Sequence, residues 1–383
     1  MKYDYIIAGS GCAGLSLLYR MLREHTLQNK KILVLDKELK NTNDRTWCFW
    51  EKTPGLFEGI VHSKWNTLEF LSTDFEAKLE LGAYTYKMIQ GIDFYEYVRN
   101  FAQNFTNVTF LQESIVAITS EENSATVKTE NNSYEGNYVF NSTSIFNPKI
   151  TVENSLLQHF KGWVIKTEVP VFDPEVGRLM DFRLSQENGA TFMYVLPTST
   201  TAALVEYTLF SPTVLEKEAY NVALENYIKN ELKIDKYVIS HEEFGVIPMS
   251  LANFKKSIGK NIMNIGTAGG FTKASSGYTF QFIQKDVSEI ISNLKLGKNP
   301  DLNLSFRDRV YNWYDRTLIA VLLSKKLTGA QVFTKMFQKI PAETILAFLA
   351  NESTLLEDIS IMKSLPLKPF LTAGLKQLIY KKK

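Results

Sequence analysis

The sequence of 383 residues has few of the residues that build metal centres and disulfide scaffolds. It contains two cysteines, Cys12 and Cys48, and four histidines, and no spacing among them resembles a zinc site. Two cysteines cannot stabilise a chain of this length, which excludes a disulfide-rich fold. We therefore expect an ordinary hydrophobic core and no metal in the functional site.

An excess of charge of one sign is missing as well. Lysine and arginine number 43 and aspartate and glutamate 41, which leaves a net charge of +2. This balance argues against binding of nucleic acid through its phosphates. The sequence also lacks a run of about 18 apolar residues that could span a membrane, and its beginning lacks the pattern of a signal peptide. We therefore expect a cytoplasmic protein.

Aromatic residues, in contrast, are abundant and make up 13% of the chain. Aromatic side chains on this scale either fill the core or line a large apolar site.

The first 36 residues follow the pattern of a dinucleotide-binding unit. A β-rich apolar run over residues 3–8 leads into Gly9, Gly11 and Gly14, then apolar residues at helical spacing, then a second apolar run that ends at Asp36. The three glycines permit a tight turn, a close approach to a pyrophosphate and close helix packing, and the helix N-terminus favours the phosphates. Asp36 can accept hydrogen bonds from the adenosine ribose. The N-terminal position, with no second copy of the motif, favours FAD over NAD.

The rest of the chain alternates between sheet and helix patterns. Residues 64–90 predict sheet, residues 92–105 predict a helix, and the chain is helical after residue 300. Shorter strand-like segments lie at 108–111, 114–118, 124–129, 138–141, 163–170, 191–196, 202–210 and 262–265. Because pieces of the nucleotide-binding unit are separated by a sheet insertion, we expect interleaved domains.

Several segments, taken together and in order, resemble the bacterial lycopene β-cyclases, a family of FAD-dependent carotenoid cyclases. They are RTWCFW at 45–50, FDP at 172–174, MDFR at 180–183, FMYVLP at 192–197, LVEYT at 204–208, EFGVIPM at 243–249, GTAGG at 266–270, SGY at 276–278 and YDR at 314–316. The resemblance covers essentially the whole chain. Departures include Ala274, where the family often has proline, and Thr267, where related flavoproteins have aspartate.

The resemblance implies a function and a fold. The substrates would be lycopene and γ-carotene and the product β-carotene, formed on FAD that NAD(P)H keeps reduced, with no net redox change. The fold would be α/β, a Rossmann-type FAD-binding flavoprotein fold with an inserted β-sheet substrate domain and C-terminal helices. We predict FAD-binding segments at 1–60, 92–148 and 246–300, substrate-domain segments at 61–91 and 149–245, and a helical, membrane-facing region at 301–383.

The resemblance also suggests site residues. Glu206 lies in an almost wholly apolar strand, where burial would raise its pKa and keep a proton available; we predict that it is catalytic. Asp181 is a second catalytic candidate, although Asp181 and Arg183 could equally form a structural ion pair. For the cofactor we predict Gly9, Gly11, Gly14, Asp36, Arg45, Gly266, Gly269 and Gly270. The last three would open a helix whose N-terminus points at the flavin pyrimidine ring.

The end of the chain is basic and apolar. After Asp358 it contains six lysines and no acid, interleaved with leucines (the lysines are Lys363, Lys368, Lys376, Lys381, Lys382 and Lys383). Such a segment can lie in an anionic membrane interface or form a helical cap on the core. With a water-insoluble substrate, we expect peripheral association with the inner face of the cytoplasmic membrane.

Two other functions fit the same sequence. One is an FAD-dependent monooxygenase or geranylgeranyl-type reductase, which would consume NAD(P)H in proportion to product. The other is a non-catalytic carotenoid-binding protein, which would release its pigment unchanged. No protein partner is suggested by the sequence.

Overall fold

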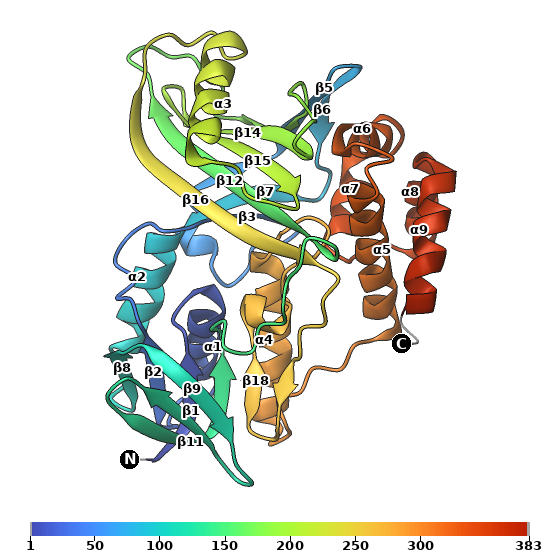
Figure 1. Ribbon diagram of the computed structural model, residues 1–383. Helices are drawn as coiled ribbons and strands as arrows, with labels where there is room; N and C mark the ends of the chain where they lie inside the picture. Colours follow the sequence, from blue (N-terminus) through green and yellow to red (C-terminus); the bar gives the residue numbers. More distant parts are fainter. Residues whose placement is uncertain (1, 381–383) are drawn as a thin grey trace.

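The computed structural model describes residues 2–380 and contains three β-sheets and a set of C-terminal helices (Figure 1). The largest sheet has the path β17-β18-β11-β1-β2-β8, with β9 and β10 joined to it through β11. Its strands are β1 (Lys2–Ala8), β2 (Ile32–Asp36), β8 (Val108–Gln112), β9 (Ile115–Ser120), β10 (Ala125–Thr129), β11 (Ser133–Asn141), β17 (Ser257–Ile258) and β18 (Ile262–Asn264). The central strands β18, β11, β1, β2 and β8 run parallel.

Three helices accompany this sheet: α1 (Cys12–Arg23), α2 (Gly91–Ala102) and α4 (Phe280–Lys295). Apolar residues of these helices share one core with the sheet, for example Leu15, Phe94 and Val287 around Phe140. The predicted strand–helix–strand unit at the start of the chain is confirmed, because β1 pairs with β2 in parallel and α1 connects them.

The second sheet has seven strands in the order β16-β12-β15-β14-β13-β5-β6. They are β5 (Thr67–Ser72), β6 (Phe75–Glu80), β12 (Ser155–Lys166), β13 (Val176–Asp181), β14 (Ala190–Ser199), β15 (Ala202–Ser211) and β16 (Val238–Ser250). Helix α3 (Lys217–Asn230) covers one face through a cluster that includes Trp163, Val205 and Leu224. A small sheet of β3 (Thr46–Glu51), β7 (Thr85–Gln90) and β4 (Ser63–Trp65) lies between the two large ones (Figure 1), with the short 3-10 helix η1 (Glu58–Ile60) before β4.

The C-terminal helices are α5 (Phe306–Leu323), α6 (Gly329–Lys339), α7 (Ala342–Leu349), α8 (Leu355–Ser364) and α9 (Leu367–Tyr380). They pack beside the seven-stranded sheet (Figure 1), where Phe337 of α6 stacks on Phe70 with 4.4 Å between ring centres. Helix α9 lies along α5, and Trp313 donates a hydrogen bond to the carbonyl of Gly374.

Two local predictions differ from the structure. Strand β16 was not predicted, and it runs through the boundary that we placed at residue 245, so the domain division stays a prediction. Residues Gly266–Gly269 form a short 3-10 helix, η2, and not the start of a long helix. Gly270 ends η2 with a φ of 74°, and α4 begins ten residues later at Phe280. Lys381, Lys382 and Lys383 lie outside the described residues.

Candidate functional site

The glycine turn after β1 forms an open cradle at the N-terminus of α1. Gly9 has a φ of 104°, which side chains other than glycine rarely adopt. A Cβ on Gly14 would lie 2.0 Å from the Gly9 carbonyl oxygen, so only glycine allows this close packing. A Cβ on Gly11, in contrast, would meet nothing within 4 Å. The turn therefore has the open space and the unpaired N–H groups that a pyrophosphate needs.

Asp36 lies at the rim of a cavity of about 370 Å³ beyond this turn. Its Oδ2 accepts hydrogen bonds from Ser10 N at 2.6 Å and Ser10 Oγ at 2.9 Å, and its Oδ1 accepts one from Glu38 N at 3.0 Å, which leaves an acceptor position on Oδ1 free. The same cavity is lined by Arg99, whose buried Nε has no hydrogen-bond partner. The position and the donor set fit the adenosine end of a dinucleotide.

The second glycine segment lies beside the first turn of α1. Gly266 has a φ of 61°, and a Cβ there would lie 2.8 Å from the Cβ of Ala13. A Cβ on Gly269 would lie 2.3 Å from the carbonyl oxygen of Asn264. The segment therefore lies beside the phosphate cradle. It is a tight turn and not the helix start that we predicted, because the positive φ at Gly266 and Gly270 prevents a continuous helix.

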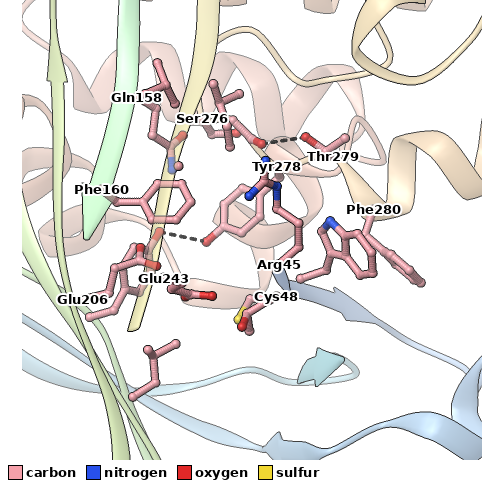
Figure 2. Close-up of a pocket in the computed structure, with 18 of the residues that line it drawn as sticks. Arg45, Cys48, Gln158, Phe160, Glu206, Glu243, Ser276, Tyr278, Thr279 and Phe280 are labelled. Carbon is pink, nitrogen blue, oxygen red and sulfur yellow. Dashed lines mark hydrogen bonds between the residues drawn. The ribbon is translucent and has the colours of Figure 1, made fainter. Parts of the chain in front are cut away.

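A cavity of about 270 Å³ lies where the seven-stranded sheet, the small sheet and the loop before α4 meet (Figure 2). Its lining is rich in aromatic side chains. The lining residues are Arg45, Thr46, Trp47, Cys48, Tyr86, Gln158, Phe160, Tyr194, Leu196, Leu204, Glu206, Glu243, Gly245, Val246, Ile247, Pro248, Thr267, Ser276, Gly277, Tyr278, Thr279 and Phe280. Of the predicted cofactor residues, Arg45 lines the same cavity as Glu206, and so does Thr267, the residue after Gly266.

Glu206 points from β15 into this cavity. Thr208 Oγ1 donates a 2.8 Å hydrogen bond to Glu206 Oε1, and within residues 2–380 no ion pair involves Glu206. Burial, followed by the charge of Glu243, raises the pKa of Glu206 well above its ordinary value. The side chain therefore has the environment of an acid that keeps its proton near neutral pH.

Glu243 is the acidic residue that sequence reasoning did not select. It lies on β16 and its side chain is 8% exposed. Burial raises its pKa, while Thr46, Glu206 and the charges of His241 and Arg45 act in the opposite direction. In the sequence Glu243 is an acid two residues after His241 and close before the apolar VIPM run, but the strand that carries it was not predicted.

Tyrosines surround the two carboxyl groups. Tyr278 OH lies 3.5 Å from Tyr194 OH, and Trp50 contacts Tyr278 edge to face with 4.5 Å between ring centres. Burial raises the pKa of Tyr278 to about 12, so the phenol stays neutral. Burial and the nearby Glu206 carboxyl raise the pKa of Cys48, which therefore stays a thiol and is no nucleophile.

Asp181 does not reach the cavity. It lies on the other face of the sheet under α3, fully buried, where Arg183 Nη2 and Tyr227 OH donate hydrogen bonds of 2.6 Å and 2.7 Å to Oδ2. Burial alone would raise its pKa, but these bonds outweigh burial and hold the pKa below its ordinary value. Of our two interpretations, the structural ion pair with Arg183 matches the geometry. The position therefore does not support a catalytic role for Asp181.

Three polar atoms in the cavity lack hydrogen-bond partners, namely Tyr86 OH, Gln158 Oε1 and Ser276 Oγ. Gln158 Oε1 and Ser276 Oγ are buried without a hydrogen bond, and both residues line the wall on the side of the loop before α4 (Figure 2). Buried polar atoms are normally paired, so unpaired ones indicate a bound group. Together with the cradle at Gly11 and the unpaired Nε of Arg99, they fit a dinucleotide that extends from Asp36 to this cavity.

Comparison with solved structures gives the fold class. The flavoprotein/dehydrogenase of Cytophaga hutchinsonii is 12% identical with a TM-score of 0.66, and the similarity covers 100% of both chains. A geranylgeranyl bacteriochlorophyll reductase-like protein of Thermoplasma acidophilum is 12% identical with a TM-score of 0.61, over 97% of this chain and 95% of the other. The flavin-dependent brominase Bmp2 is 12% identical with a TM-score of 0.62, over 100% of both chains. At this identity the comparison shows the fold alone, a Rossmann-type FAD-binding flavoprotein fold.

Sequence comparison identifies the family. The lycopene beta-cyclase of Paracoccus sp. (strain N81106 / MBIC 01143) is 25% identical over 228 residues, 56% of this chain and 58% of the relative. The match therefore spans little more than half of that relative's length. The family model described as "Lycopene cyclase protein" matches residues 4–375. Because that match covers nearly all of the described residues, the chain belongs to the lycopene cyclase family.

Proposed function

We propose that this protein cyclises the ψ-ends of lycopene to β-ionone rings, giving γ-carotene and then β-carotene, with no net redox change. The observation that carries the proposal is the carboxyl pair Glu206 and Glu243 in an aromatic-lined cavity beside the FAD-binding fold (Figure 2). Membership of the lycopene cyclase family supports carotenoid substrates.

Glu206 is the proposed acid of the reaction. Its proton is transferred to the terminal double bond of the ψ-end, which leaves a tertiary carbocation. The next double bond attacks this cation and closes the ring, and loss of one ring proton to a carboxylate gives the β-ring. One proton enters and one leaves, so substrate and product are isomers. A buried carboxyl with a raised pKa suits the first step, because it still carries a proton near neutral pH.

The aromatic lining suits the cationic intermediate. The rings of Tyr194, Tyr278, Phe160 and Trp47 border the same cavity as Glu206. A desolvated aromatic face attracts a cation by about 2 kcal/mol. The rings also exclude water, which would otherwise trap the cation as an alcohol. The lining therefore favours ring closure over hydration.

FAD fits the cradle at Gly9, Gly11 and Gly14, the rim at Asp36 and the unpaired atoms of Gln158 and Ser276. When bound and reduced, it would supply electron density that stabilises positive charge, and NAD(P)H is the proposed reductant. Gly11→Val places a branched side chain in the open space of the cradle and should abolish the yellow flavin colour. Gly59→Val is the matched control, because Gly59 also has nothing within 4 Å. Full flavin occupancy in Gly11→Val would contradict FAD binding at this turn.

We further propose that α9 holds the protein at a membrane surface. No helix in the described part of the chain is long and apolar enough to cross a membrane. Helix α9 nevertheless exposes four leucines at helical spacing, Leu367, Leu371, Leu375 and Leu378, each more than half exposed. Exposed lysines on the same helix, Lys368 and Lys376, would contact anionic headgroups.

Flotation with vesicles that contain anionic lipid tests this surface. The triple variant Leu371→Ser, Leu375→Ser and Leu378→Ser should lose most vesicle binding and keep its fold, since the three side chains are exposed. Val222→Ser, at a 46% exposed apolar residue of α3, is the control and should bind as the unchanged protein does. Equal binding by all three proteins would remove the role of α9.

Expression in a lycopene-accumulating bacterium, followed by pigment analysis, tests the proposed reaction. A cyclase yields γ-carotene and β-carotene. A monooxygenase yields oxygenated pigment, a reductase yields pigment with added hydrogen, and a carotenoid-binding protein leaves lycopene unchanged. Unchanged or oxygenated pigment from a flavin-loaded protein would overturn the proposal.

A further inference from the structure

Gly162 lies between the two acidic residues of the cavity. It is near the middle of β12, where it pairs with Glu206 of β15 on one side and with Glu243 of β16 on the other. Residues directly opposite each other in a sheet place their side chains on the same face. Both glutamates therefore rise from the cavity face on either side of a residue that has no side chain.

The missing side chain is what lets the two carboxyl groups meet. Neighbouring strands lie about 4.8 Å apart, so β15 and β16, which both flank β12, are separated by about 10 Å. A Cβ on Gly162 would lie 3.1 Å from Glu243 Cγ and 3.2 Å from Glu243 Oε1. The side chain of Glu243 thus lies over Gly162, which pairs with Glu206 on its other side. The same Cβ would lie 3.0 Å from Leu204 Cδ1, so a larger residue at position 162 would crowd Leu204 and Glu243 together.

The surroundings give the pair two weak sources of positive charge, Arg45 and His241, and several neutral groups. Arg45 and His241 favour the charged form of Glu243 only as minor contributions, and neither forms an ion pair with it. The other titratable groups that affect the two carboxyls or line the same wall are Cys48 of β3, Tyr86 of β7, Tyr194 of β14 and Tyr278 of the loop before α4. Two neighbouring carboxyls that influence each other and have no bonded cation cannot both ionise easily, so we expect them to retain one proton between them.

We propose that Glu243 is a second acid–base residue of this cavity, that it shares one proton with Glu206 across Gly162, and that Gly162 is the positioning residue for this contact. The catalytic part rests on the proposed cyclase function. After Glu206 gives its proton to the terminal alkene carbon, both carboxylates are ionised beside the carbocation. The ring proton then returns to one of them and restores the singly protonated pair, so protons and charge balance over the cycle.

Infrared titration of the flavin-loaded protein without substrate tests the shared proton directly. The C=O band of a protonated carboxyl should persist to a higher pH in the unchanged protein than in Glu243→Gln or Glu206→Gln. Losing a partner should lower the midpoint by about one pH unit or more, the threshold for strongly coupled groups. Glu242→Gln is the matched control, because Glu242 is the adjacent residue and pairs with Lys161 at 3.0 Å. An unchanged midpoint in Glu243→Gln would overturn the proposal.

Gly162→Ala tests the positioning role with both carboxyls kept. Its added methyl group should separate them, lower the same infrared midpoint and move the alkaline limb of the pH–rate profile in the same direction. Melting temperature and flavin occupancy report whether Gly162→Ala is folded. If this variant does not fold, the titration of Glu243→Gln alone tests the shared proton. If the infrared titration shows the shared proton but the protein forms no rings, the cyclase function is overturned and the shared proton stands. If Glu243→Gln forms rings normally and its pH–rate profile is unshifted, the shared proton is overturned and the cyclase function stands.

Discussion

The two faces of the seven-stranded sheet hold buried acids in opposite electrostatic settings. Under α3, Asp181 accepts hydrogen bonds from Arg183 and Tyr227, and its pKa lies below the ordinary value. On the cavity face, Glu206 and Glu243 have no ion pair among the described residues, and the pKa of each lies above the ordinary value. Burial is common to both faces. The neighbours decide whether a buried carboxyl becomes a fixed anion or a source of protons.

The largest expected effect is on catalysis. Glu206→Gln keeps the size of the side chain but cannot transfer a proton, and it should reduce the rate of ring formation at least about a hundredfold. Asp181→Asn, on the other face, should keep near-normal activity per folded, flavin-loaded molecule. Pigment analysis of both variants measures this. Near-normal β-carotene from Glu206→Gln would show that the acid lies elsewhere.

Stability should show the reverse order. Asp181→Asn removes the buried carboxylate between Arg183 and Arg178, which keep only the more exposed Glu231 and Glu69 as charged partners. It should lower the free energy of unfolding by about 3 kcal/mol, the low end for a broken buried pair. The low end applies because the Arg183 side chain is 34% exposed. Glu206→Gln removes no ion pair and should cost far less. Urea unfolding of the two variants at pH 7 measures the loss in the free energy of unfolding. Equal losses in Asp181→Asn and Glu206→Gln would contradict the proposed difference between the two faces of the sheet.

The pH dependence of stability gives a smaller but more specific effect. The folded-state pKa of Glu206 is raised above 4.5, so its contribution is fully present below about pH 4.5 and is lost as pH rises towards the folded-state pKa. The unchanged protein should therefore lose stability relative to Glu206→Gln between pH 5 and pH 8, by at least about 1 kcal/mol. Unfolding curves at both pH values measure the difference. A constant difference would mean that the carboxyl ionises normally in the folded protein.

Local patterns predicted the parts of the site that neighbouring residues determine. The turn from Gly9 to Gly14 and the acid at Asp36 are set within one strand–helix–strand unit, and the structure places them as the pattern requires. Glu206 was selected mainly through the resemblance of LVEYT at 204–208 to the cyclase family, together with its apolar strand, and it does line the cavity.

The positions of Glu243 and Asp181 could not be predicted from local patterns, because they depend on pairing between distant segments of the chain. Glu243 reaches the cavity because β16 pairs with β12, about 80 residues earlier in the chain, in a register that places it opposite Gly162. For Asp181 the sequence left a catalytic role and an ion pair with Arg183 open. The side chain lies under α3 because β13 has a register irregularity between Arg178 and Asp181, and Asp181 pairs with Met193, whose side chain packs under α3. A shift of one residue moves a side chain to the other face, and alternation within one strand does not reveal it.

The amount of reductant consumed per ring tests most directly whether the cavity works as an acid–base site. The flavin-loaded protein, reduced once under anaerobic conditions, would be given lycopene and a measured amount of NAD(P)H, and rings formed would be compared with NAD(P)H oxidised. Because substrate and product are isomers, we expect many rings to form and the ratio of NAD(P)H oxidised to rings formed to be near zero. A ratio near one would contradict this expectation and would favour a reductase on the same fold.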